Sequence, residues 1–549
     1  MFDWVTNAYG RVVAWSLRLS IIVLFVYGGL LTLTYLGFIR LPSGFIPNQD
    51  KGYLIANVQL PDAASLERSV ETMDKIREIV LETPGVAHMI DIPGMSFVMN
   101  GNASNFGSIF IILKPFHERR SPEMYSEAIA NALRMRVMSE IQQAQVLVFG
   151  APAVDGLGNA GGFTLMLEQT GNVDLPELER QTTNLSAQAS KLPGFLGMFS
   201  SFRASTPQLY VDVDRVKCKT MKVELSEVFE TLQVFLGGYY VNDFNRFGRT
   251  WQVNVQADAP FRVTADKVRQ FRVRNASGEM VPLGSVATVR DDTGPVFVLR
   301  YNMYPATAVN GITLPGVSTG TVIDTIEALC KRELGRGMAY EWSGLTFMQR
   351  EALRTESLKD LLQNPFTAFV GAVVLVFLVL SALYESWSLP FSVVLVVPMC
   401  LLCALAGVFI AQMDLNIFVQ VGFVVLVGLA SKNAILIVEF ARDRQGDGAT
   451  LFDASVEAAR VRLRPIIMTS FAFILGVVPL VLSKGAGAEM RRTLGTAVFS
   501  GMLGVTLFGI FLTPVFYYVV RYFVKTTPKQ RAPNEALAAR DLQSPLAGR

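Results

Sequence analysis

The chain has 549 residues, 51% of them hydrophobic, a mean hydropathy of +0.36 and a formal net charge of +3. It is too apolar for an ordinary soluble protein, and its small, evenly spread charge does not indicate nucleic-acid binding. Four cysteines do not form a disulfide framework, and neither His88 nor His117 has metal-ligand spacing to them, so no metal or other cofactor is expected.

Apolar segments predict six membrane-spanning helices. The first, 16–38, is longer than a signal-peptide core and has no small-x-small cleavage site, so it is interpreted as an uncleaved transmembrane helix. It belongs to a unit of residues 1–42, the cytoplasmic N-terminus with the first helix, and residues 346–525 carry five more helices. These five predicted spans are 366–384, 391–411, 416–441, 465–483 and 495–520.

Basic residues outside the spans indicate the orientation. The predicted loop 442–464 has five arginines, and four basic residues lie between positions 521 and 531. Both groups fall on one side when six spans are threaded, and the positive-inside rule makes that side cytoplasmic, although three basic residues in the loop 484–492 oppose this weakly. The region after the first span is then outside the cytoplasm. Residues 526–549, rich in Pro, Ala and Arg, are predicted to be a disordered cytoplasmic tail.

Strand and helix patterns alternate in the central region. A strand in 52–60, a serine-capped helix over 65–83 and strands over 86–92 and 108–114 predict a split βαβ unit of ferredoxin-like type. The turns at Pro84-Gly85 and Pro193-Gly194, 109 residues apart, indicate an internal duplication. Residues 206–294 interrupt the second copy as an inserted α+β module.

Lys432 lies in the middle of the predicted span 416–441. A lysine at this depth costs about 2.5–3.5 kcal/mol on insertion scales, so it indicates a partner carboxylate or a water-filled path. The alternative is a lysine that snorkels to the headgroups, which is disfavoured because nine residues separate it from Arg442. Lys432 is therefore predicted to be part of a charge relay.

Two residues, one just before and one within the next predicted span, extend this pattern. Arg462 and Thr469 are seven residues apart, hence on one helix face and about 10.5 Å apart along the axis. Alternatives stay open for both, since Thr469 can bond back to its own helix and Arg462 can anchor the chain at the cytoplasmic surface.

No residues indicate an enzyme. The sequence shows no nucleophile–base pair, and the glycine-rich GNAGG (158–162) has no following Lys-Ser/Thr, so neither catalysis nor ATP hydrolysis is expected.

Four strings carry a resemblance to a known family: LPSGFIPNQDKGYLIANVQLP, SALYESWSLPFSVVLVVP, VGLASKNAILIVEFARD and RVRLRPIIMTSFAFILGVVPLVLSKGAGAE. From about residue 10 to 525 the chain resembles the C-terminal half of AcrB/MexB-type multidrug efflux pumps. These pumps form the hydrophobe/amphiphile branch of the resistance-nodulation-division (RND) superfamily. The resemblance implies six helices of a twelve-helix plan.

The resemblance gives Lys432, Arg462 and Thr469 a role in proton transfer. In the family, the matching residues face two adjacent aspartates on a helix of the N-terminal half. Lys432 is expected to bind the deprotonated carboxylates, and protonation to release it so that the helices reorient. Each proton supplies about 2.3 kcal/mol per 100 mV of membrane potential. No aspartate lies mid-span in this chain, so the relay needs the other half.

The resemblance also divides the outer region. It implies a first porter subdomain (43–167), a second (168–205 with 295–345) and a docking subdomain (206–294) that meets an outer-membrane channel. The substrate pocket is expected to be lined by Ile90, Ile92, Met95, Phe97, Phe110, Phe163 and Leu165.

Two of these pocket residues share a strand face and one lies in a loop. Ile90 and Ile92 are two residues apart, so they point to the same side of a strand. Phe97 falls in the predicted loop 93–105, which matches the family's switch loop. The alternative, that these are ordinary core residues, stays open, above all for Ile90 and Ile92.

The prediction is one half of a proton-driven exporter of amphiphilic small molecules in the bacterial inner membrane, surrounded by lipid, with its large domain in the periplasm. The implied partners are an N-terminal half with the aspartate pair, a homotrimer, a periplasmic adaptor and an outer-membrane channel. The chain begins with Met1 just before the seventh helix of that plan, as a split-gene product, a fragment or an inactive remnant would. The alternatives are a membrane-anchored binding or assembly module that does not transport, or metal export. Met95 and Met99 form no clear three-methionine set for metal export.

Overall fold

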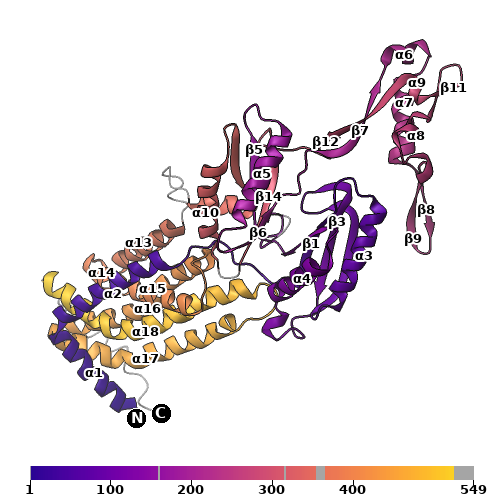
Figure 1. Cartoon of the computed structure of the whole chain (residues 1–549). Coiled ribbons are helices and arrows are strands. Elements are labelled where there is room, and N and C mark those ends of the chain that lie inside the picture. Colours follow the sequence, from indigo (N-terminus) through magenta and orange to yellow (C-terminus); the bar gives the residue numbers. More distant parts are fainter. Residues whose placement is uncertain (1, 159–160, 315–316, 354–364, 525–549) are drawn as a thin grey trace.

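The computed structural model describes residues 2–158, 161–314, 317–353 and 365–524. A long helix bundle forms one end of the molecule, two α+β units lie beside the bundle, and a narrow arm extends away from them (Figure 1). We call the end of the bundle beside the α+β units the head end. The predicted tail, 526–549, lies outside the described residues.

Six helices of the described chain are long and apolar enough to cross a membrane, which agrees with the predicted number of spans. α14 and α15 form one of these spans, interrupted at residues 395–396 just before Pro398, which has no backbone N–H to donate. The helices are α2 (Ser20–Arg40), α13 (Pro365–Tyr384), α14 (Ser388–Val394), α15 (Val397–Ile410), α16 (Ile417–Gly446), α17 (Leu451–Val481) and α18 (Ala488–Val524).

The predicted loop 442–464 is almost entirely helical. α16 continues to Gly446 and α17 begins at Leu451, with Thr450 as the N-cap that accepts a hydrogen bond from the Asp453 N–H. The prediction is wrong because it placed the helix ends at the edges of the apolar segments. Both helices continue through charged turns that lie beyond those segments.

α18 packs closely against α15, α16 and α17. A Cβ added at Gly495 would lie 2.8 Å from Leu480 of α17, and one at Gly501 would lie 2.3 Å from Leu426 of α16. Small residues at helix contacts let two backbones approach and interlock. α18 is therefore held tightly against its neighbours.

Helix α1 (Phe2–Arg18) precedes the first membrane helix and lies at the end of the bundle away from the head (Figure 1). Its buried Tyr9 and Val13 belong to the bundle core, and the Tyr9 hydroxyl donates to the Ile510 carbonyl at 2.8 Å. Trp4 and Trp15, 71% and 65% exposed, lie on the opposite face.

The first α+β unit is a four-stranded antiparallel sheet in the order β2-β3-β1-β4, with α3 and α4 on one face. α3 connects the parallel, non-adjacent β1 and β2, which is a split βαβ arrangement. Leu54, Ile109 and Ile111 point from the sheet into the core beneath these helices. The elements are β1 (Tyr53–Gln59), α3 (Leu66–Glu82), β2 (Val86–Ser96), β3 (Gly101–Leu113), η1 (Pro122–Met124), α4 (Ser126–Glu140) and β4 (Gln145–Gly150).

The predicted loop 93–105 is instead the end of a β-hairpin. β2 and β3 stay paired through Met95↔Asn102 and Ser96↔Gly101, so only residues 97–100 connect them. The Gly- and Asn-rich composition is typical of a loop, but pairing with the neighbouring strand outweighs it here.

The second α+β unit has the strand order β13-β14-β5-β15, with β6 also paired to β14. The predicted boundary at residue 167 falls inside β5, which pairs with β14 and β15 and belongs wholly to this unit. The elements are β5 (Phe163–Gln169), α5 (Leu175–Ala189), β6 (Phe195–Phe199), β13 (Leu299–Tyr301), β14 (Tyr304–Thr313), α10 (Thr319–Glu333), β15 (Met338–Ser343) and α11 (Gly344–Leu353).

The arm in Figure 1 begins and ends with the antiparallel pair β7 (Thr206–Val213) and β12 (Ala287–Gly294). Beyond this pair, a small core forms around Cys218, Val228 and Val286. The remaining elements are α6 (Arg215–Thr220), α7 (Leu225–Leu232), η2 (Gln233–Gly237), β8 (Tyr239–Arg246), β9 (Arg249–Val255), η3 (Ala259–Phe261), α8 (Ala265–Arg269), β10 (Arg272–Arg274), β11 (Met280–Pro282) and α9 (Leu283–Val286).

The chain leaves the bundle for the head through a tight crossing. The Gly44 N–H donates to the Leu415 carbonyl at 3.2 Å, and the Leu415 N–H donates to the Pro42 carbonyl at 2.9 Å. A Cβ at Gly44 would lie 1.5 Å from the Asp414 Oδ2, so a larger residue here would displace the Asp414 side chain.

Candidate functional site

Lys432 lies on a face of α16 that the rest of the described chain leaves open. Its neighbours on this face are exposed, whereas Phe423, Leu426 and Val427 between them are buried. Among the described residues, Lys432 has neither a hydrogen bond nor an ion pair. Between residues 417 and 441, the exposed positions of α16 are 421, 424, 425, 428, 432 and 439, whose spacing puts them on one side of a helix.

A hydrogen bond between α16 and α17 shows that Lys432 and Thr469 lie at the same depth along the bundle. The buried Asn433 Nδ2 donates to the Ser470 Oγ at 3.2 Å. Lys432 and Thr469 each precede one of these residues, so they lie at the same depth in the bundle. The Thr469 hydroxyl donates to the Ile466 carbonyl at 3.2 Å, which is the bond to its own helix that the sequence left open.

Arg462 points toward α16 instead of into solvent. Its guanidinium lies 5.0 Å from the centre of the Phe440 ring, a cation–π contact, and its Nε is buried without a hydrogen-bond partner among the described residues. Arg462 and Thr469 are two helical turns apart on α17, with Arg462 farther from the head. Together with Lys432, they supply two cations and a hydroxyl on adjacent helices.

Four of the predicted pocket residues meet in the head. Ile90 and Phe110 are directly paired across β2 and β3, and the Phe97 ring packs edge-on against Phe110 at 5.2 Å between centroids. Ile92 follows on the same side of β2, opposite Ser108. Ile90 is 53% exposed, so this face of the hairpin is an accessible apolar surface and not part of a core.

Ser108 holds the turn of this hairpin in place. Its hydroxyl donates to the Met95 carbonyl at 3.0 Å and accepts from the Phe97 N–H at 2.7 Å. Met95 and Phe97 are therefore fixed next to the paired Ile90 and Phe110. The described residues contain no group of three or more His, Cys, Asp or Glu that could hold a metal ion.

Phe163 and Leu165 lie elsewhere, in the core of the second α+β unit. The Phe163 ring contacts Phe195 at 6.1 Å and Trp342 at 5.9 Å, and Leu165 is completely buried. The structure does not bring these two residues to the hairpin face, and a role for them in a pocket stays a prediction.

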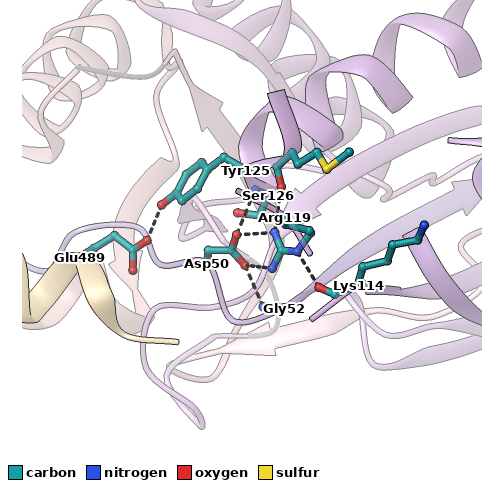
Figure 2. Close-up of polar contacts among 8 residues, drawn as sticks. Asp50, Gly52, Lys114, Arg119, Tyr125, Ser126 and Glu489 are labelled. Atoms are coloured by element: carbon teal, nitrogen blue, oxygen red, sulfur yellow. Dashed lines mark hydrogen bonds and ion pairs between the residues drawn. The ribbon is translucent and has the colours of Figure 1, made fainter. Parts of the chain in front are cut away.

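A polar site that was not predicted from the sequence lies where the head meets the bundle (Figure 2). Asp50 and Arg119 form a buried ion pair with side chains only 3% and 1% exposed, and the Tyr125 hydroxyl donates to the Glu489 Oε1 at 2.5 Å. Tyr125 is 41% exposed, but burial of the rest of its side chain, and then the hydrogen bond to Glu489, raise its pKa, so the phenol stays protonated at neutral pH. No spacing rule connects these positions, since Tyr125 and Glu489 are 364 residues apart.

Comparison with known proteins identifies the family. A membrane helix bundle with two α+β units and an arm is the architecture expected from the resemblance, and the family model described as AcrB/AcrD/AcrF family matches residues 1–521. The chain belongs to the AcrB/AcrD/AcrF family of RND transporters, which confirms the resemblance.

Of three similar proteins, two are named as exporters, and the third is named as a multidrug resistance protein. The chain is 36% identical over 521 residues to the multidrug export protein AcrF of Escherichia coli K12, covering 94% of this chain and 49% of AcrF. It is 38% identical over 509 residues to the multidrug resistance protein MdtF of E. coli O157:H7, covering 92% and 47%. It is 36% identical over 521 residues to the toluene efflux pump membrane transporter TtgB of Pseudomonas putida, covering 94% and 48%. The chain thus spans about half the length of the curated relatives it matches.

Proposed function

We propose that the chain is the C-terminal half of a proton-driven exporter of amphiphilic small molecules. The observation that carries this proposal is Lys432, a cation on an open face of a membrane helix with no partner among the described residues. Leaving such a charge in hydrocarbon is costly, so a second set of helices is needed to cover it. The export functions named for its relatives support the same conclusion.

In this proposal, deprotonated carboxylates on a helix of the N-terminal half bind Lys432. Protonation removes their negative charge, weakens the pairing and changes the packing of the open face of α16. The Asn433–Ser470 hydrogen bond passes this change to α17, which carries Arg462 and Thr469. Each proton crossing the membrane supplies about 2.3 kcal/mol per 100 mV to the cycle.

The head supplies the substrate and partner surfaces in this proposal. The apolar hairpin face of Ile90, Ile92, Phe97 and Phe110 suits an amphiphilic molecule, because it offers aromatic and aliphatic contacts without a charged group. The molecule works as a trimer in the inner membrane, with the head in the periplasm, an adaptor bound outside and the arm meeting an outer-membrane channel.

Substitution of Lys432 tests the proposal. Lys432→Ala, co-expressed with a complementary half in a pump-deficient strain, is expected to abolish dye efflux and the accompanying proton flux while the protein stays in the membrane. Val425→Ala, on the same open face but uncharged, is the matched control and is expected to remain active. Unchanged proton-coupled efflux in Lys432→Ala would refute the proposal and favour a membrane-anchored module that does not transport.

A further inference from the structure

A buried ion pair fixes one loop of the head at its base (Figure 2). The Arg119 Nη1 and Nη2 donate to the two Asp50 oxygens at 2.8 and 3.1 Å, and its Nε donates to the Lys114 carbonyl at 2.7 Å. The Arg119 guanidinium also lies 4.7 Å from the centre of the Phe116 ring. The segment from residue 114 to residue 126 is thus wrapped around one charge pair.

Tyr125 is held from both sides by this pair. The carbonyl of the preceding Met124 accepts from Arg119 Nη1 at 3.0 Å, and the N–H of the following Ser126 donates to Asp50 Oδ2 at 3.1 Å. Since both neighbours are fixed, the backbone of Tyr125 has little freedom, and its side chain is presented in one direction. That direction is toward the bundle, as Figure 2 shows.

The tyrosine meets the first turn of α18. Its hydroxyl donates to Glu489 Oε1, while Glu489 Oε2 is buried without a partner among the described residues. The adjacent Met490 Sδ lies 3.5 Å from the Gln49 Nε2, one residue before Asp50. Head and bundle are therefore joined here at two neighbouring positions of α18, apart from the covalent connections between them.

The joined helix α18 also touches both relay helices, α16 and α17. The glycine contacts at Gly495 and Gly501 leave α18 no gap against α17 and α16. α17 carries Arg462 and Thr469, and α16 carries Lys432. Because α18 interlocks with both helices, a shift of either one is expected to move α18 as well.

We propose that Tyr125 and Glu489, supported by the Asp50–Arg119 pair, form a coupling joint through which movement of α18 repositions the first α+β unit. This inference rests on the proposed transport function and adds the contact by which the bundle drives the head. Both residues are positioning residues: they act on the hairpin face only through the unit that carries it.

The joint is tested in the full chain co-expressed with its complementary half. Tyr125→Phe and Glu489→Leu each remove the hydrogen bond and are expected to lower dye efflux about tenfold, because a charge-assisted bond biases the engaged state by about that factor. The double variant is expected to export dye as fast as the less active of the two single variants, because each single substitution already removes the same hydrogen bond. Glu489→Gln keeps an acceptor oxygen and is expected to restore most of the efflux.

Hydrogen-exchange rates of the purified complex distinguish a mechanical connection between head and bundle from a loss of structure confined to the substituted segment. Glu489→Leu is expected to speed exchange in residues 121–126, and Tyr125→Phe in residues 483–492, so that each change is detected across the joint. Glu71→Gln, which removes an exposed ion pair with Lys75 in the same unit, is the control and is expected to change neither efflux nor exchange.

Each result bears on a different claim. Full efflux in Tyr125→Phe and Glu489→Leu, together with inactive Lys432→Ala, would overturn the joint and leave the proposed function intact. Additive losses in the double variant, or exchange that changes only in the substituted segment, would also overturn the joint. If Lys432→Ala exports normally, the proposed function fails, while exchange transmitted across the contact would still support a mechanical connection.

Discussion

The Arg119→Met variant gives the sharpest test of how the head is held together. The Asp50 and Arg119 side chains are 3% and 1% exposed, so the substitution leaves a carboxylate that water cannot reach. Breaking a buried ion pair by removing one partner costs about 3–5 kcal/mol. Asp50 keeps hydrogen bonds from the N–H groups of Gly52 and Ser126, which places the expected loss near the lower end, at about 3 kcal/mol.

The loss is measured as the free energy of unfolding of the full chain in detergent, with hydrogen exchange in β1 and β3 as the local readout. Arg180→Met is the matched control, because the Arg180–Glu177 pair is 66% and 34% exposed and water screens its attraction. The double variant Asp50→Leu/Arg119→Met, with no charge left to bury, is expected to be more stable than Arg119→Met alone.

The reasoning is refuted if Arg119→Met loses no more stability than Arg180→Met. It is also refuted if the double variant is less stable than Arg119→Met, because the unpaired carboxylate would then not be the source of the cost.

Two further predictions concern groups in the head. Burial and then the neighbouring Glu341 raise the pKa of Glu168 above its ordinary value of 4.5, so the folded chain binds this proton more tightly than the unfolded chain and loses stability as the pH rises above that value. Glu168→Gln is therefore expected to make the free energy of unfolding less sensitive to pH as the pH rises above about 4.5, and an unchanged slope would contradict this. Burial raises the pKa of the Cys330 thiol to about 12, so native Cys330 is expected to react with N-ethylmaleimide far more slowly than in the denatured chain, as mass spectrometry can measure. Equal rates in the two states would show that the thiol is accessible.

Hydropathy and periodicity were enough to predict the six spans and the alternation of strand and helix, because both depend on burial of local apolar patterns. The helical ends beyond 441 and before 465 were not predicted, since those turns carry charged residues and are stabilised by capping at Thr450 and by contacts between helices. The strand ends within 93–105 were not predicted either. Their Gly- and Asn-rich composition is typical of a loop, but pairing between β2 and β3 extends both strands into it.

Some residues of the candidate site were also predictable from the sequence, and others were not. Lys432 was found from sequence because a charge in an apolar run is a local signal. The seven-residue spacing singled out Arg462 and Thr469, and the resemblance gave these two residues a role in proton transfer. The Tyr125–Glu489 contact has no local signal: a tyrosine before a helix and a glutamate in the first turn of another helix are both ordinary. Only the fold brings these two positions together.

The hairpin of β8 and β9 has one more consequence. Every residue of both strands is exposed, and they are joined by a turn at Phe247 and Gly248, both with positive φ. A lone two-stranded ribbon is at best marginally stable in water, and within the described residues no third strand pairs with this one. The unaccompanied chain is therefore expected to sample many shapes at this tip. If a surface of the assembled protein covers the ribbon, cleavage after Arg246 and Arg249, which flank the turn, is expected to slow, and a protease that cleaves after arginine would detect this.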